Sequence, residues 1–121
     1  MYGEIYVGSA AADAPANRGW LLGHFMPGGD IRRSADVEIK WGVHPRDDQR
    51  AQWVTGETRT ALILLVSGRF RLDFPGRSVL LAKQGDYVVF ERVDHSWHAE
   101  EESVIIGVRW PSVPGYATPL A

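Results

Sequence analysis

Apolar and polar residues alternate along several short segments of the chain, and this alternation predicts β-strands. In residues 36–44, apolar residues at the odd positions alternate with Glu38, Lys40, Gly42 and His44. In residues 69–74, three apolar residues alternate with arginine and aspartate. A period of two is typical of strands with one face buried. Both segments are therefore expected to be half-buried strands.

Turn signals divide the remaining apolar segments into short pieces. Pro27–Asp30, Ser67–Gly68, Pro75–Gly76 and 83–86 are rich in glycine, proline and aspartate, which favours turns. Strands are predicted at 2–7, 20–26, 36–44, 58–66, 69–74, 78–82, 87–90 and 103–110. A helix is expected only near residues 10–18, where Pro15 limits it to about one turn. Short strands at this spacing predict an all-β sandwich or barrel.

Composition narrows the class of protein further. A chain of 121 residues predicts one domain, residues 1–121, large enough to fold without a metal or disulfide staple. There are no cysteines, which excludes thiolate sites and is in keeping with a cytoplasmic protein. A net charge of −2 without a basic stripe argues against nucleic acid as a partner. No secretory signal and no membrane-spanning apolar segment is expected.

Three segments resemble the cupin superfamily. They are LILLVSGRFRLDF at 62–74, SVLLAKQGDYVVF at 78–90 and VDHSW at 93–97. Cupins carry a glycine turn between two strands, a Gly-Asp pair before the next strand and a histidine just after it. The resemblance implies a single-domain cupin barrel, also called a double-stranded β-helix or jelly roll. Its core would span about 36–110, with added N-terminal strands and an extended tail at 111–121.

The resemblance also implies where a metal would bind. Cupin metal sites use two histidines and a glutamate from a first motif and one histidine from a second. Only His95 maps onto the second motif, whereas the family's spacing puts Ala61 at the glutamate position. With the charged loop counted as an insertion, His44 recovers one histidine of the first motif. His44 and His95, with Glu57 as a carboxylate, could form a sparse site for iron, zinc, manganese or nickel.

Strand parity predicts further residues of a pocket. One strand face carries Glu57, Arg59, Ala61 and Ile63. If Ile63 points into the barrel, Glu57 and Arg59 lie at its mouth on the same side. A buried arginine needs a carboxylate or an anionic ligand. If the protein is an enzyme, which the sequence leaves open, His95 and Glu57 are the expected catalytic proton-transfer pair.

The aromatic residues and the other histidines divide between pocket and core. Trp97 is expected in the pocket because it lies two residues from His95, and Trp53 is a further candidate for ligand binding. Trp20 and Trp41 are expected to fill the core or a dimer interface. His24 is expected to be a hydrogen-bonded core or interface residue, and His98 to lie on the solvent side.

Three functions therefore stay open. The first is binding of a small polar or anionic molecule in the barrel by His44, Arg59, Trp97 and Trp53. The second is a metal-dependent dioxygenase or isomerase that uses His44 and His95. The third is a non-catalytic sensor or dimerisation domain. A homodimer is expected because an isolated barrel would expose apolar strand edges near the N-terminus, and no membrane partner is expected.

Overall fold

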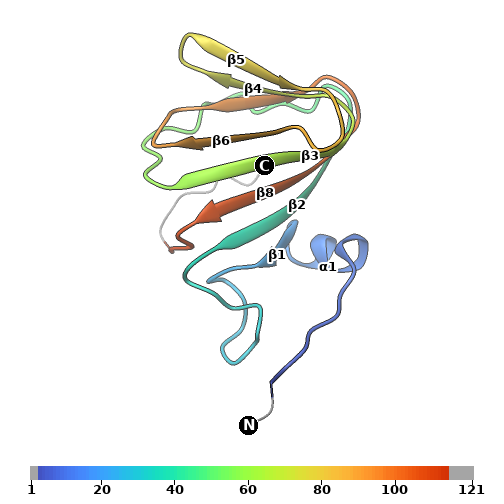
Figure 1. The fold of residues 1–121 in the computed structure, drawn as a ribbon, viewed down its shortest axis with the longest axis vertical. Helices are drawn as coiled ribbons and strands as arrows, with labels where there is room; N and C mark the ends of the chain where they lie inside the picture. Colours follow the sequence, from blue (N-terminus) through green and yellow to red (C-terminus); the bar gives the residue numbers. More distant parts are fainter. Residues whose placement is uncertain (1–2, 115–121) are drawn as a thin grey trace.

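Two antiparallel sheets face each other in the computed structural model, which describes residues 3–114 (Figure 1). The larger sheet has the strand order β1-β2-β8-β3-β6, and the smaller sheet has the order β5-β4-β7. The elements are α1 (Ala10–Ala16), β1 (Trp20–Leu22), β2 (Glu38–His44), β3 (Thr60–Ser67), β4 (Phe70–Phe74), β5 (Arg77–Leu81), β6 (Tyr87–Glu91), β7 (Ser96–Ala99) and β8 (Ser103–Trp110). The predicted all-β barrel is thus confirmed.

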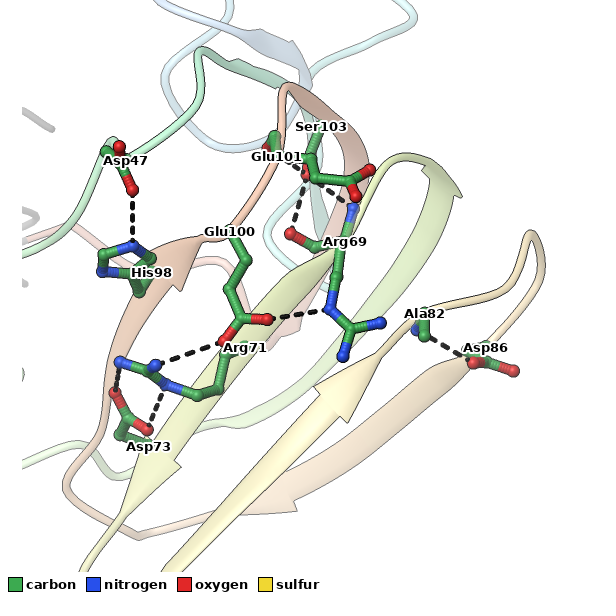
Figure 2. Close-up of polar contacts among 10 residues, drawn as sticks. All are labelled: Asp47, Arg69, Arg71, Asp73, Ala82, Asp86, His98, Glu100, Glu101 and Ser103. Atoms are coloured by element: carbon green, nitrogen blue, oxygen red, sulfur yellow. Dashed lines mark hydrogen bonds and ion pairs between the residues drawn. The ribbon is translucent and has the colours of Figure 1, made fainter.

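The buried core lies between the two sheets. Leu65 and Ile105 of the larger sheet meet Phe70 and Leu72 of β4. The alternation predicted in 69–74 holds, because Phe70 and Leu72 are buried whereas Arg71 and Asp73 pair with each other on the outer side, as Figure 2 shows. Packing of these apolar faces joins the sheets.

The predicted strand at 36–44 exists as β2, but its inward face is the reverse of what hydropathy suggests. Glu38 is only 2% exposed, whereas Val43 is 60% exposed. Lys40, Gly42 and His44 share the face of Glu38, so the polar side of β2 looks into the barrel. Trp41 lies on the outer side, where α1 runs alongside the strand. A buried charge network, described below, makes this arrangement possible.

The N-terminal part of the chain differs from expectation. Residues 3–9 form no strand, and the strand expected over 20–26 ends at Leu22, because Gly23 adopts a positive φ of 152°. The helix α1 spans seven residues and contains Pro15, so it is longer than the single turn expected. The end of the extended tail, residues 115–121, and Tyr2 lie outside the described residues. No helix in residues 3–114 is long and apolar enough to span a membrane.

Two glycine turns that the sequence marks are built differently. Gly68, between β3 and β4, has a φ of 98°, and an added Cβ would collide with the carbonyl oxygen of Glu102 and the side chain of Ser103. Gly85, before β6, has a φ of 90° but open space around it. At that turn Asp86 accepts hydrogen bonds from the backbone N–H groups of Ala82 and Lys83, at 3.1 and 3.0 Å.

We expect Gly68→Ala to lower the free energy of unfolding by about 2–4 kcal/mol, because it adds a steric clash to the cost of a positive φ. Gly85→Ala is the matched control, since it has the same kind of φ without the clash, and it should cost only about 1 kcal/mol. Urea unfolding of both variants measures the difference. Equal losses would show that the contact with residues 102 and 103 relaxes freely.

Candidate functional site

A cavity of about 120 Å³ lies between the two sheets. Both sheets and the loop between β2 and β3 contribute side chains. The lining residues are Trp20, Lys40, Gly42, His44, Arg50, Val54, Arg59, Ala61, Ile63, Phe70, Leu72, Phe90, His95, Trp97, Ile105, Gly107 and Arg109. This volume is below the 300–1,000 Å³ usual for drug-sized ligands, so the cavity suits a small molecule.

Small residues on adjacent strands leave the space open. Gly107 of β8 pairs with Lys40 of β2 on one side and with Ile63 of β3 on the other. A Cβ at Gly107 would lie 3.5 Å from Cδ1 of Ile63 and 3.9 Å from Cβ of Lys40, which are ordinary contacts. The fold could therefore hold a small side chain at residue 107, and glycine at this position leaves space in the cavity.

One part of the cavity is strongly cationic. Lys40, Arg50, Arg59 and Arg109 all line it, and no aspartate or glutamate does so within residues 3–114. Trp20 covers this part, with its ring centroid 5.3 Å from Nζ of Lys40 and 4.6 Å from Cζ of Arg109. Cations at such distances from an indole face are stabilised by its π-electrons.

Two of these cations have carboxylate partners buried behind the cavity wall. Glu57 accepts hydrogen bonds from Nε and Nη2 of Arg59 at 2.8 and 2.9 Å, a bidentate pair. Glu38 contacts Nη1 of Arg59 at 3.4 Å and Nη2 of Arg109 at 2.8 Å. Ser112 donates to the other oxygen of Glu38 at 2.9 Å. Both glutamates are fully enclosed, so the network satisfies charges that water cannot reach.

The other two cations, Lys40 and Arg50, form no ion pair with a carboxylate of residues 3–114. Nε of Arg50 is buried and has no protein hydrogen-bond partner there. Burial lowers the pKa of Lys40, and the neighbouring Arg109 and Arg50 lower it further. Four cations and two glutamates leave a net charge of about +2 around the cavity, which favours an anion.

An aromatic surface forms the part of the cavity next to β4. The ring of Trp97 stacks on Phe70 at 5.6 Å, and His44 packs edge-on against Trp97 at 4.5 Å. Nδ1 of His44 donates to the carboxylate of Asp48 at 2.8 Å. In the neutral ring this bond leaves the lone pair on Nε2.

His95 directly precedes β7, in the connection that follows β6. Its ring centroid is 4.7 Å from that of Phe90. Burial lowers the pKa of His95, Arg50 and Arg109 lower it further, and the carbonyl of Val93 and the charge of Glu57 oppose the shift. Nδ1 donates to the carbonyl oxygen of Val93 at 3.1 Å. The neutral ring therefore also carries its lone pair on Nε2, as a proton acceptor would require.

The structure brings together four of the residues that the sequence singled out: His44, Arg59, His95 and Trp97 line the cavity. Glu57 does not line it, because Arg59 occupies both of its oxygens. These bonds outweigh the effect of burial, which opposes them, and lower the pKa of Glu57. An ionised glutamate paired in this way acts as a counter-ion rather than as a proton donor. Trp53 is 42% exposed and lies outside the lining.

Sequence reasoning missed Lys40, Arg50, Arg109 and Trp20 as pocket residues. Trp20 was expected in the core or an interface, whereas it covers the cationic part of the cavity. Strand parity could have found Lys40, because it shares a face with His44. Arg50 had no such signal, since it lies in a loop that pairs with β7: its N–H donates to the carbonyl oxygen of Trp97 at 3.0 Å.

The two remaining histidines lie outside the cavity. Nδ1 of His24 is 2.7 Å from Oγ of Ser112, so His24 is a hydrogen-bonded, partly buried residue at the far end of the Glu38 network. His98 lies on the outer side of β7, where it contacts Gln49 at 3.0 Å. Its contact with Asp47, at 3.3 Å, is drawn in Figure 2.

The side chains present do not fit the metal site that the resemblance implies. No three histidine, aspartate or glutamate side chains come together as ligands anywhere in the described part of the chain. His44 and His95 both reach the cavity, but the expected third ligand, Glu57, is bound by Arg59. Three protein ligands are the usual minimum for a catalytic metal.

No family model and no curated protein matches the sequence. Solved structures do match the fold. KdgF from a Halomonas species has a TM-score of 0.59 and 20% identity, over 67% of this chain and 74% of its own. A cupin 2 conserved barrel domain protein from Salinispora arenicola has a TM-score of 0.57 and 20% identity, over 71% of both chains. An RmlC-like cupin from Shewanella frigidimarina has a TM-score of 0.56 and 15% identity, over 66% and 70%. Together with the strand order, these similarities show that the chain has the cupin fold.

Proposed function

We propose that this small cupin-type protein binds a small anionic molecule inside its barrel. The observation that carries the proposal is the pair of cations, Lys40 and Arg50, that line the cavity without a carboxylate partner among the described residues. Arginine and lysine side chains bind carboxylate or phosphate oxygens through charge-assisted hydrogen bonds. Burial lowers the pKa of Lys40, repulsion from Arg109 and Arg50 lowers it further, and an anion between the two cations would relieve that repulsion.

The structural network around the cavity supports binding over catalysis as the primary role. Glu38 and Glu57 hold Arg59 and Arg109 in place, so the cationic surface is preorganised before a ligand arrives. Of the expected catalytic pair, His95 and Glu57, only His95 lines the cavity, and its neutral ring has the lone pair on Nε2. It could accept a proton from a bound molecule, but Glu57 offers it no partner.

We expect Lys40→Met to weaken anion binding by about tenfold, because it removes one charged contact and keeps an unbranched apolar side chain of nearly the same length. The control is Lys83→Met, a change at an exposed lysine outside the cavity. Thermal shift and calorimetry with acetate, benzoate, succinate and phosphate measure binding to each protein. If none of these anions binds the unmodified protein, or if Lys40→Met binds as tightly, the proposal is overturned.

A further inference from the structure

The cavity is polarised, and this polarity constrains the ligand more narrowly than charge alone. Trp20, Lys40 and Arg109 gather at one part, because Lys40 pairs with Trp20 in the sheet and both Lys40 and Arg109 approach its ring. The charge of Arg50 also acts on Lys40. The part next to β4 is built mainly from hydrocarbon and ring surface, and the ring of His44 packs against it. Its lining residues are Ile63, Phe70, Leu72, Trp97 and Ile105.

We infer that the ligand is a monocarboxylate with a compact apolar body, such as a branched short chain or a single ring. This inference rests on the proposed function, since it assigns the anionic group to the same cations. The carboxylate would lie between Lys40 and Arg50, and the body would lie against Phe70 and Trp97. An apolar body placed there exchanges water for hydrocarbon and ring contacts, which favours binding.

Two alternatives fit the cavity less well. A phosphate ion or a dicarboxylate would use the cations but would leave the apolar surface without a partner. A second carboxylate placed against Phe70 and Leu72 would lose its hydration, which is costly, and the N–H of the neutral His44 ring beside them is already donated to Asp48. The size of the cavity, about 120 Å³, also excludes ligands with several rings.

Gly107 offers a way to test the space that the body of the ligand would fill. Its pairing positions place it between Lys40 and Ile63, and its missing side chain opens the cavity floor. Gly107→Ala adds one methyl group at ordinary contact distances from both neighbours, so the fold accommodates it. The added methyl occupies space that the body of the ligand would need, while every cation stays in place.

The experiment compares benzoate and 3-methylbutanoate with acetate, phosphate and succinate by calorimetry. We expect the first two to bind about tenfold or more tightly than acetate, because each buries additional carbon atoms. Gly107→Ala should weaken benzoate binding several-fold, and by a clearly larger factor than it weakens acetate binding. Gly3→Ala, which adds a methyl group outside the cavity, should change neither, and urea unfolding confirms that both variants are folded.

The outcomes separate the two proposals. If no anion binds, both the proposed function and this inference are overturned. If phosphate, succinate or acetate binds as tightly as benzoate, the anion site stands and the inference about an apolar body is overturned. The same holds if Gly107→Ala weakens acetate and benzoate equally. Only selective loss of benzoate affinity supports a monocarboxylate with an apolar body.

Discussion

Glu38→Gln is expected to lower the free energy of unfolding by about 3–5 kcal/mol, the usual loss when one partner of a buried ion pair is removed. Glu38 is 2% exposed and contacts both Arg59 and Arg109. Glutamine has the same shape but no charge, so the buried guanidinium of Arg59 and the partly buried one of Arg109 would remain near each other with only Glu57 to balance them. Urea unfolding at neutral pH measures the loss.

Glu100→Gln is the matched control for this prediction. Figure 2 shows Glu100 between two arginines, with Nε of Arg69 at 2.9 Å and Nη1 of Arg71 at 3.3 Å. The charge arrangement resembles that around Glu38, but all three side chains are partly exposed to solvent. Solvent-exposed ion pairs contribute about 0–1 kcal/mol, so Glu100→Gln should be close to neutral. Similar losses in the two variants would contradict the role assigned to burial.

Acidification is expected to destabilise the fold, and Glu57 is one cause. Its pKa in the folded protein lies below the ordinary value of 4.5, because the hydrogen bonds and charge of Arg59 outweigh the opposing effect of burial. The unfolded chain therefore takes up a proton at Glu57 before the folded chain does. The stabilisation from this group is complete above about pH 4.5 and is lost as the pH falls through the lower, folded value.

His95 adds a second loss of stability, which begins at a higher pH than the loss from Glu57. Burial lowers its pKa below the ordinary 6.5, so the unfolded chain also binds this proton first. Its contribution is complete above pH 6.5 and declines as the pH falls towards the folded value. Urea unfolding between pH 7.5 and pH 3, values chosen to bracket both windows, tests these statements. Glu57→Gln should flatten the lower part of the profile and His95→Gln the upper part, whereas an unchanged slope in either variant would contradict the assignment.

The fold was largely predictable because its strands carry local signals. Apolar alternation located β4, and the glycine turns at Gly68 and Gly85 located the ends of β3 and the start of β6. The strand β7 was missed, because its four residues, Ser96–Ala99, are too few and too mixed to show a period. It is held instead by pairing with β4, a contact between residues distant in sequence.

The site was only partly predictable, for a related reason. Parity from Ala61 and Ile63 led correctly to the inward position of Arg59, because both neighbours are apolar and buried or half-buried. Hydropathy would instead turn the apolar side of β2 inward, whereas its polar side chains face the barrel. A prediction from hydropathy takes the buried face to be apolar. Glu38 is an exception, because arginines on β8 and near the start of β3 pair with its charge. Those partners cannot be read from the segment itself.

The reversed strand β2 has a consequence for any attempt to redesign this protein. Replacing Val43 with threonine changes a side chain that is 60% exposed and should be tolerated. Gly42, the preceding residue, does not share this freedom, because a Cβ there would lie 2.8 Å from Nε2 of His44 and 3.0 Å from Cγ1 of Ile105. A mutagenesis library that varies the hydrophilic positions of β2 and keeps its hydrophobic ones would therefore change the inward face of the strand and leave the exposed face untouched. Most variants in such a library should be damaged.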